Sequence, residues 1–217
     1  MIYVVTGPSG CGKSSLLARV LALVPATAFS VSHTTRPRRP SEEDGREYRF
    51  VDEPAFQKLV RRGAFLEWAR VHGHLYGTAK REVAAKARAG DVLLDIDVQG
   101  ALQIRAQGPK AVFVFVLPPS YRALEQRLRG RGDEPPEAVA VRLRNARREV
   151  RFYRRFDYCV VNDDLERAVG ELAAILLAGR ARTAARAREA AAIVRTFAGA
   201  APPGRRTRTA AGQGKRR

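Results

Sequence analysis

The sequence predicts an α/β fold in which helices cover a parallel β-sheet. Short apolar runs alternate along the chain with helix-like patterns, which is typical of parallel strands joined by crossover helices. Residues 112–117 are all apolar, so we expect them to form a strand that is buried on both faces. A glycine-rich segment joins the first apolar run to the first helical pattern, as expected for a strand-to-helix turn at the edge of such a sheet.

The composition supports one large folded domain or two small ones. The chain has 217 residues, of which 45% are apolar, and this excludes collagen, coiled coil and wholesale disorder. No apolar run approaches the roughly 18–20 residues of a membrane span, and no export signal is visible. The two cysteines, Cys11 and Cys159, cannot form a disulfide framework. We therefore expect a soluble protein of the reducing cytoplasm, with no membrane contact.

The positive charge is concentrated at the C-terminal end of the chain. Lys and Arg number 40 and Asp and Glu number 22, which gives a net charge of +18. Residues 180–217 contain 11 basic residues and one acid, Glu189, or +10, which leaves +8 for residues 1–179. That moderate excess suits a domain that binds phosphorylated ligands. We predict a folded domain at 1–179 and a basic Ala/Arg-rich extension at 180–217, with a helical pattern at 180–199 and disorder beyond.

The core elements follow from apolar runs and from residues that start or stop helices. Asp52 and Thr78 stand where N-caps are expected, and Gly63, Gly90 and Gly108 stand where helices are expected to end. The expected core strands are residues 3–6, 92–96, 111–117 and 158–161. The expected helices are residues 14–23, 54–62, 79–89, 99–107, 121–129, 136–155 and 165–178.

One segment interrupts this alternation. Three short strand-like pieces, at 29–33, 47–51 and 65–71, surround one helix and an arginine-rich loop. We interpret residues from about 29 to 78 as an inserted lobe of mixed α and β structure. The core then consists of residues 1–28 and 79–179.

The glycine-rich segment matches the phosphate-binding pattern G-x-x-x-x-G-K-[ST], in the strand-to-helix setting that this pattern requires. Backbone N–H groups of such a loop surround phosphate oxygens, Lys13 reaches the β- and γ-phosphates, and the Ser14 hydroxyl ligates Mg²⁺. The alternative is a turn that binds nothing. Cys11 is either a small residue that fits the loop or a redox-sensitive thiol. The expected ATP site, called the P-loop below, consists of Gly7, Pro8, Ser9, Gly10, Cys11, Gly12, Lys13 and Ser14, with Ser15 following it.

Seven further motifs follow the P-loop in order and resemble those of guanylate kinases over residues 3–177. They are SVSHTTRPRR at 30–39, GREY at 45–48, FLEW at 65–68, LYGT at 75–78, LDIDVQG at 94–100, RLRGRG at 127–132 and VNDD at 161–164. The resemblance implies a P-loop NTPase core of three α/β/α layers, a GMP-binding lobe at about 29–78 and a short helical lid at about 127–145. It implies transfer of the γ-phosphate of ATP to GMP, and to dGMP, with Mg²⁺ as cofactor.

The resemblance also assigns roles to particular residues. Glu67 selects guanine, because its two carboxylate oxygens can accept the adjacent N1–H and N2–H donors of that base. The implied GMP-phosphate ligands are Arg36, Arg39, Tyr48 and Tyr76, and Ser32, Thr78 and Asp97 lie beside the base. The implied catalytic cations are Lys13, Arg127, Arg131 and Arg142, and Asp95 joins Ser14 near the metal.

Several alternatives stay open at this stage. Arg36–Arg39 could be a solvated basic loop, Glu67 a strand surface residue, Asp97 a helix cap, and the lid arginines a basic helix surface. Leu75 replaces an expected aromatic residue and is expected to alter packing around the phosphate ligands. Rival functions are a guanylate-kinase-like module that binds a phosphorylated partner and a kinase for another monophosphate. The basic extension is either a solvated end or a weak site for RNA or another polyanion.

Overall fold

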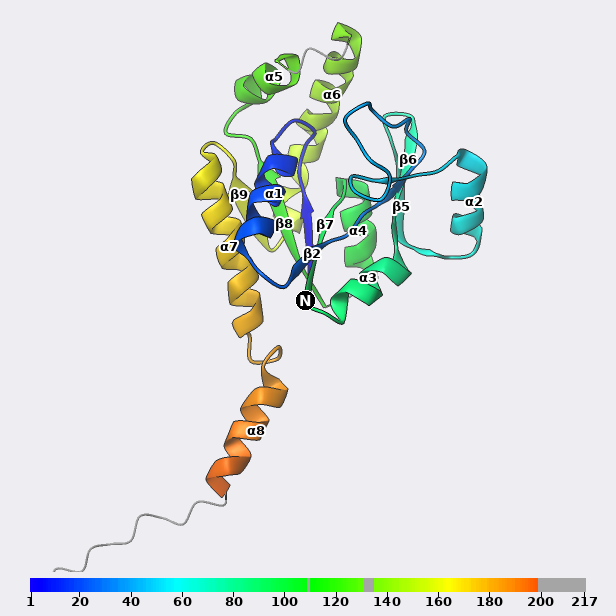
Figure 1. Ribbon diagram of the computed structural model, residues 1–217. Helices are drawn as coiled ribbons and strands as arrows, with labels where there is room; N and C mark the ends of the chain where they lie inside the picture. The colour runs from blue at the N-terminus through cyan, green and yellow to red at the C-terminus, as the bar shows by residue number, and fades with distance from the viewer. Residues whose placement is uncertain (109, 131–134, 199–217) are drawn as a thin grey trace, which may run out of the picture. The chain divides into compact units, whose positions relative to one another are not determined.

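The computed structural model describes residues 1–108, 110–130 and 135–198 (Figure 1). The chain divides into two compact units, Met1–Arg180 and Ala181–Arg217. In the second unit, helix α8 (Ala187–Ala198) exposes more than half of each of three apolar side chains, Ile193, Val194 and Phe197. None of the helices in the described ranges is long and apolar enough to cross a membrane.

The core of the first unit is a five-stranded sheet in the order β2-β7-β1-β8-β9. All neighbouring strands are parallel, as the alternation of strands and helices predicts. The chain starts at the centre of the sheet, moves to one edge with β2, and later crosses to the other side of β1 with β8. The bounds are β1 (Ile2–Thr6), β2 (Thr27–Phe29), β7 (Asp91–Asp95), β8 (Ala111–Leu117) and β9 (Tyr158–Val161).

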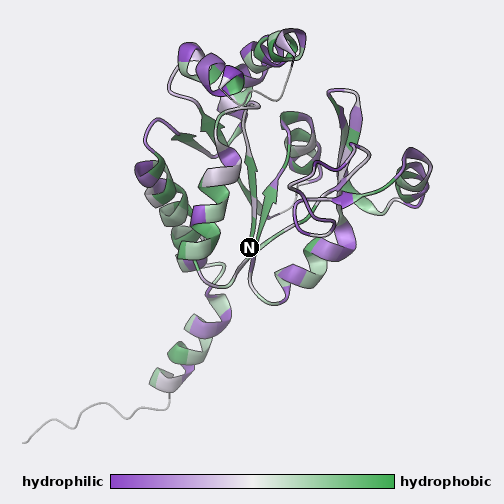
Figure 2. Cartoon of the chain, turned by 45° about the horizontal axis from the view of Figure 1, so that its top comes forward, coloured by the Kyte–Doolittle hydropathy of each residue, from purple (hydrophilic) through white to green (hydrophobic). Residues whose placement is uncertain are grey.

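Helices cover both faces of this sheet, which gives the predicted three layers. Tyr3 and Val5 of β1 pack on one face with helices α1 (Lys13–Leu23) and α7 (Leu165–Ala181). Val4 points to the opposite face, which helices α3 (Lys80–Ala87) and α4 (Val98–Ala106) cover. Strand β8 is buried on both faces, as its unbroken apolar run predicts. Figure 2 shows the core strands as mostly hydrophobic and the covering helices as mixed.

The inserted lobe has its own four-stranded sheet in the order β4-β3-β6-β5. Strands β3 and β4 are parallel, and the remaining pairs are antiparallel. Phe56, Phe65 and Leu75 form a small core between this sheet and its helix. The bounds are β3 (His33–Thr34), β4 (Arg49–Phe50), α2 (Glu53–Arg61), β5 (Phe65–Val71) and β6 (His74–Ala79).

The lobe departs from the sequence-based prediction at two strands. The prediction of one strand at 29–33 is wrong, because Phe29 ends β2 in the core sheet and His33 begins β3 in the lobe sheet. Residues 30–32 carry the chain from one sheet to the other. Strand β6 was not expected, and it extends to Ala79, so helix α3 begins at Lys80. The predicted N-cap at Thr78 is therefore wrong, since Thr78 is a strand residue.

Two further helices of the first unit pack against each other in a separate apolar cluster. Helices α5 (Tyr121–Arg129) and α6 (Pro136–Glu149) share a cluster of five buried apolar residues. The helix expected at 136–155 ends earlier, and a 3₁₀ segment (Val150–Arg155) replaces its last part. The predicted caps at the ends of α2 are present: Asp52 accepts a hydrogen bond from the Ala55 N–H at 2.7 Å, and Gly63 has a positive φ of 60°.

Candidate active site

A cavity of about 770 Å³ extends from the P-loop to the inserted lobe. The P-loop follows β1, the central strand, so the cavity lies at the carboxyl edge of the sheet, where open α/β folds bind ligands. The predicted site residues that line it are Gly7, Ser9, Gly10, Gly12, Lys13, Ser14, Ser32, Arg36, Arg39, Tyr48, Glu67, Tyr76, Asp95, Asp97 and Arg142. Pro8, Cys11, Ser15, Thr78 and Arg127 are not among its lining residues, and Arg131 lies outside the described residues.

The P-loop curls back on itself at the end of β1. Gly10 and Gly12 have φ values of +87° and +90°, which L side chains rarely adopt, so glycine is required at both positions. The Lys13 ammonium donates to the Gly7 carbonyl at 2.7 Å, across the mouth of the loop. Burial lowers the pKa of Lys13, but nearby negative groups, Asp95 among them, outweigh this and raise it overall. Lys13 is therefore a stable cation.

The thiol of Cys11 faces the protein interior. Its side chain is completely buried, and burial raises the pKa of Cys11, with the charge of Lys13 opposing that shift. A protonated and inaccessible thiol is a poor redox sensor. The structure favours the alternative in which Cys11 is a small residue that fits the loop.

Two carboxylates lie at the carboxyl end of β7, with Asp95 as its last residue and Asp97 two residues beyond. Because Asp95 pairs in register with Val5 of β1, it lies beside the start of the P-loop. Burial raises the pKa of Asp95, and the charge of Lys13 opposes that shift. Asp97 caps helix α4, since its Oδ1 accepts from the Gly100 N–H at 2.9 Å. The alternative in which Asp97 is a helix cap is thus confirmed, and Asp97 also lines the cavity.

Glu67 is a buried carboxyl group in the lobe part of the cavity. Only 4% of the residue is exposed, so the alternative of a strand surface residue is wrong. Its Oε1 accepts from the Thr78 hydroxyl at 2.5 Å, and that hydroxyl lies 3.3 Å from the hydroxyl of Ser32. Burial raises the pKa of Glu67 to about 7, the hydrogen bond from Thr78 opposes the shift, and the charge of Asp97 adds to it.

Gly100 explains how helix α4 approaches Glu67 so closely. A Cβ atom at position 100 would lie 2.3 Å from Glu67 Oε2, which is far inside van der Waals contact. The glycine therefore leaves room for the carboxyl group. Gly100 is the last residue of the motif LDIDVQG, but the sequence did not predict this role. The contact joins Gly100 to Glu67, which lies in a distant part of the chain.

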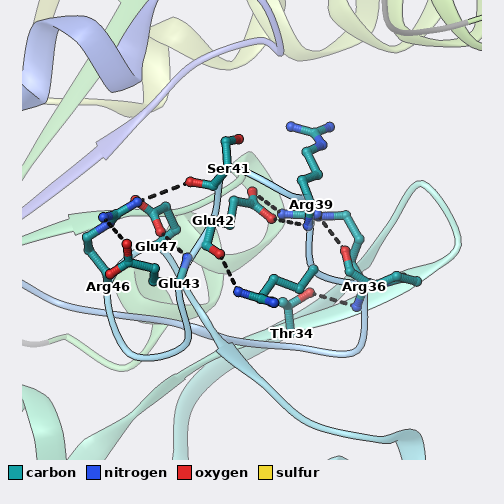
Figure 3. A network of polar contacts seen from close by, with 10 residues as sticks. Thr34, Arg36, Arg39, Ser41, Glu42, Glu43, Arg46 and Glu47 are labelled. Carbon is teal, nitrogen blue, oxygen red and sulfur yellow. Dashed lines mark hydrogen bonds and ion pairs between the residues drawn. The ribbon is translucent and has the colours of Figure 1, made fainter.

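The arginine-rich loop forms an ordered network around a second buried carboxylate, Glu42 (Figure 3). Arg36 Nη2 donates to Glu42 Oε1 at 2.7 Å, and the Arg39 backbone N–H donates to Glu42 Oε2 at 2.9 Å. Burial opposes ionisation of this group, but those hydrogen bonds outweigh it and lower the pKa of Glu42. Glu42 was not predicted, and its only sequence signal is its place three residues after Arg39. The loop is not simply solvated.

Two aromatic rings, those of Tyr48 and Tyr76, pack beside Arg36 of the arginine-rich loop. The guanidinium carbon of Arg36 lies 5.4 Å from the centre of the Tyr48 ring, and the rings of Tyr48 and Tyr76 meet edge to face at 5.7 Å. Burial and the charge of Asp95 raise the pKa of Tyr48, so its hydroxyl is a hydrogen-bond donor throughout the neutral range. A guanidinium and two phenols thus meet in one wall of the cavity, as the phosphate of a nucleotide requires.

The arginines expected in the lid lie in different surroundings. Arg142 of α6 lines the cavity. Arg127 of α5 instead donates to two backbone carbonyls, that of Cys11 at 3.2 Å and that of Asn162 at 2.8 Å. Glu149, at the end of α6, also lines the cavity and was not predicted. Burial raises the pKa of Glu149, and the charge of Lys13 opposes that shift.

Comparison with known proteins gives a consistent result. The family model for guanylate kinase matches residues 1–178. A guanylate kinase of Thermotoga maritima is 50% identical over 182 residues, which cover 83% of this chain and 88% of the relative. One from Symbiobacterium thermophilum is 50% identical over 198 residues, covering 91% and 92%. A crystal structure of guanylate kinase from Anaplasma phagocytophilum aligns with a TM-score of 0.69 at 31% identity, covering 84% and 87%.

Proposed function

This chain belongs to the guanylate kinase family, and we propose how its residues carry out the transfer of the γ-phosphate of ATP to GMP. The resemblance predicted from its motifs is confirmed, and the activity is ATP-dependent phosphorylation of GMP. The observation that carries the residue assignment is the buried carboxyl group of Glu67, which faces the same cavity as Lys13.

The lobe is the proposed acceptor site. Glu67 accepts hydrogen bonds from N1–H and N2–H of guanine, and Ser32, Thr78 and Asp97 surround the base edge. Adenine would present an N1 lone pair to the carboxylate and would be rejected. Arg36, Arg39, Tyr48 and Tyr76 hold the GMP phosphate. None of these contacts involves the ribose 2′-hydroxyl, so we expect dGMP to be an acceptor as well.

The P-loop is the proposed donor site, where residues 7–15 bind the phosphates of ATP. Guanylate kinases use a divalent metal ion with ATP, and we propose Mg²⁺, held by Ser14 and Asp95. In the described ranges no three His, Cys, Asp or Glu side chains could hold a metal together. A hydroxyl and one carboxylate fit Mg²⁺, which keeps most of its ligands as water and phosphate oxygens. When bound, the ion neutralises charge on the β- and γ-phosphates.

The reaction then needs positioning and charge rather than a general base. An anionic oxygen of the GMP phosphate forms a bond to the γ-phosphorus, and the bond from that phosphorus to the bridging oxygen of ADP breaks. Lys13 and Arg142 line the cavity where negative charge moves during this transfer. Arg131 is proposed to join them, and enclosure of the two nucleotides excludes water as a competing acceptor.

A coupled assay of ADP release with four acceptors tests the proposal. We expect rapid turnover with GMP, turnover with dGMP, and little with AMP or UMP. Lack of turnover with GMP would contradict the activity, and faster turnover with AMP would contradict the role of Glu67. The alternative of a binding module without catalysis is not favoured, because Lys13, Ser14 and the phosphate-binding arginines are all present.

The variant Lys13→Met tests the P-loop assignment separately. The substitution removes the ammonium group and keeps a side chain of similar length, so we expect turnover to fall by at least about a thousandfold. Thermal unfolding should change little. Near-normal turnover would contradict the assignment of Lys13 to the phosphates of ATP.

We also propose a cellular setting for the protein and a binding partner for its basic extension. Two free cysteines, buried Cys11 and exposed Cys159, support the expectation of a reducing, cytoplasmic setting. For the basic extension we keep the proposal of a weak polyanion contact. Retention of the full chain on an RNA column should disappear as salt rises from 50 to about 200 mM. Retention that does not depend on salt would contradict it.

A further inference from the structure

The P-loop is held from outside by two side chains that meet at one backbone carbonyl. Asn162 Nδ2 donates to the Cys11 carbonyl oxygen at 2.8 Å, and Arg127 Nη1 donates to the same oxygen at 3.2 Å. Arg127 Nη2 donates to the Asn162 carbonyl oxygen at 2.8 Å. The guanidinium of Arg127 therefore joins helix α5, the P-loop and the segment after β9.

The fit around this contact leaves no free space. A Cβ atom at Gly12 would lie 2.4 Å from Asn162 Nδ2, and one at Gly10 would lie 2.7 Å from Leu128 Cδ2. Both Asn162 and Leu128 are almost fully buried. The P-loop is thus packed directly against helix α5 and Asn162, at the two glycines whose backbone only glycine readily adopts.

Peptide geometry connects this contact to phosphate binding. In a trans peptide the carbonyl and the next N–H point in opposite directions. Arg127 and Asn162 hold the Cys11 carbonyl away from the cavity, so the Gly12 N–H of the same peptide must point the other way. Gly12 itself lines the cavity. Fixing the carbonyl therefore fixes a donor for a phosphate oxygen.

We propose that Arg127 and Asn162 are positioning residues that set the P-loop N–H groups for ATP by holding the Cys11 carbonyl. Arg127 then acts through the loop, in contrast to Arg142, which lines the cavity directly. The proposal rests on the proposed function for its ligand, ATP. It differs from the resemblance-based expectation, in which Arg127 supplies charge to the transferring phosphate.

The experiment compares Arg127→Ala, Arg127→Lys and Asn162→Ala with a matched control, Arg129→Ala. Arg129 lies on the same helix, but it is exposed and pairs only with Glu125 in the described structure. ATP affinity is measured by calorimetry without GMP, and KM for ATP, KM for GMP and kcat are measured separately. Thermal unfolding of each variant shows whether it is folded.

We expect Arg127→Ala and Asn162→Ala each to weaken ATP binding about tenfold, the effect of losing one or two hydrogen bonds to the carbonyl. KM for GMP should stay within about twofold. Arg127→Lys keeps the charge but cannot reach both carbonyls, so it should restore only part of the affinity. Arg129→Ala should match the parent chain.

Two results would overturn the proposal. If Arg127→Lys binds ATP as the parent does and Asn162→Ala has no effect, Arg127 acts by charge alone. If Arg127→Ala lowers kcat about a thousandfold with unchanged ATP affinity, it contacts the transferring phosphate. Should Arg127→Ala fail to fold, Arg127→Lys and Asn162→Ala still decide the question. A parent chain that binds ATP but does not phosphorylate GMP would contradict only the proposed function.

Discussion

In the proposed acceptor site, Glu67 is the residue that distinguishes guanine from adenine. Its carboxyl group is buried against Thr78 and close to Asp97, and both burial and Asp97 favour the neutral form. Guanine requires the opposite form, because only the ionised carboxylate offers acceptors to both N–H groups. Binding of GMP must therefore release the proton that Glu67 holds near neutral pH.

A pH dependence of GMP binding follows from this coupling. With a pKa of about 7 in the empty site, Glu67 is mostly protonated at pH 6 and mostly ionised at pH 8. Affinity for GMP should rise across that range, by up to about tenfold per pH unit below the pKa, and level off above it. Calorimetric titration from pH 6 to 8.5 measures the effect.

The variant Glu67→Gln is the control for that titration. The phosphate of GMP has its own second pKa near 6 and contributes to any pH profile. That contribution remains in Glu67→Gln, while the contribution of the carboxyl group is lost. Identical pH profiles for the two proteins would contradict the proposed role of Glu67.

Gly100 provides a second prediction for the same pocket. In Gly100→Ala the new methyl group would meet Glu67 Oε2 at 2.3 Å, so the carboxyl group must shift. We expect KM for GMP to rise by at least about tenfold, the effect of one misplaced hydrogen-bonding group, while KM for ATP is unchanged. Steady-state kinetics with each substrate varied in turn measure both constants.

Gly170→Ala is the matched control, because Gly170 lies in helix α7 with open space around it. It should leave both constants unchanged and raise stability by about 0.5–1 kcal/mol, since alanine favours a helix over glycine. Equal effects of the two substitutions on KM for GMP would mean that the fit between Gly100 and Glu67 has no importance for binding.

At the scale of elements, the sequence predicts the core better than the lobe. Parallel strands buried on both faces are unbroken apolar runs, so β1, β7 and β8 can be predicted from the apolar pattern of the sequence. Strand β9 lies at the edge of the sheet and is mostly exposed, but its short apolar run also predicts it. In the lobe, β5 was predicted with its bounds, whereas β3 and β4 have only two residues each. Their existence depends on pairing with distant strands, which no local pattern records.

The site residues also divide into those that a local pattern predicts and those that depend on distant contacts. Residues placed by a local pattern or by a motif, such as Lys13 and Glu67, were predicted from the sequence and line the cavity. Glu42, Gly100 and Asn162 act through contacts with partners that are known only after folding. Asn162, for example, meets a carbonyl 151 positions away along the chain. Asn162 belongs to the motif VNDD, but composition and spacing do not identify the carbonyl that it contacts.

Leu75 was expected to alter packing around the phosphate ligands, and the structure gives its location. Its side chain is completely buried with Phe56 and Phe65 in the lobe core, while its neighbour Tyr76 lines the cavity. Neighbouring side chains of a strand point to opposite faces, so Leu75 supports the sheet from behind.

Leu75→Ala should therefore destabilise the lobe in particular. Removing a buried leucine side chain costs about 2–5 kcal/mol, and the small lobe has few other apolar contacts to compensate. Hydrogen exchange should accelerate in β5 and β6 and stay unchanged in β1 and β8, and GMP affinity should fall more than ATP affinity. Leu23→Ala, at an exposed leucine, is the control. Uniform acceleration over the whole chain would contradict a separate role for the lobe core.

At the scale of the whole molecule, an ion pair fixes the end of the first unit. Arg180 donates to Asp91 at 2.6 Å and to the Pro25 carbonyl at 2.7 Å, and only 7% of the Asp91 side chain is exposed. The last turn of α7 is thereby attached to the strand that carries Asp95 at its other end.

Two truncations that differ by two residues test this attachment. A chain that ends after Ala181 keeps Arg180, and one that ends after Gly179 lacks it. We expect the shorter chain to lose about 0.5–1.5 kcal/mol of unfolding free energy, because Asp91 loses the hydrogen bond from Arg180 but keeps its ion pair with the N-terminal ammonium at 2.8 Å. Both should phosphorylate GMP as fast as the full chain at 25 °C. Equal thermal stability of the two would show that the ion pair contributes nothing.

The inserted lobe leaves the core after β2 and returns at α3, the helix that precedes β7. Strands β2 and β7 are neighbours, so the lobe is an enlargement of one crossover connection and leaves the strand order intact. Most of the proposed acceptor ligands are consequently encoded between residues 29 and 80, while Asp97 and Gly100, at the same pocket, belong to the core. We therefore expect a different lobe, grafted between residues 29 and 80, to change the acceptor when Asp97 and Gly100 are adapted with it, while the P-loop is left unchanged.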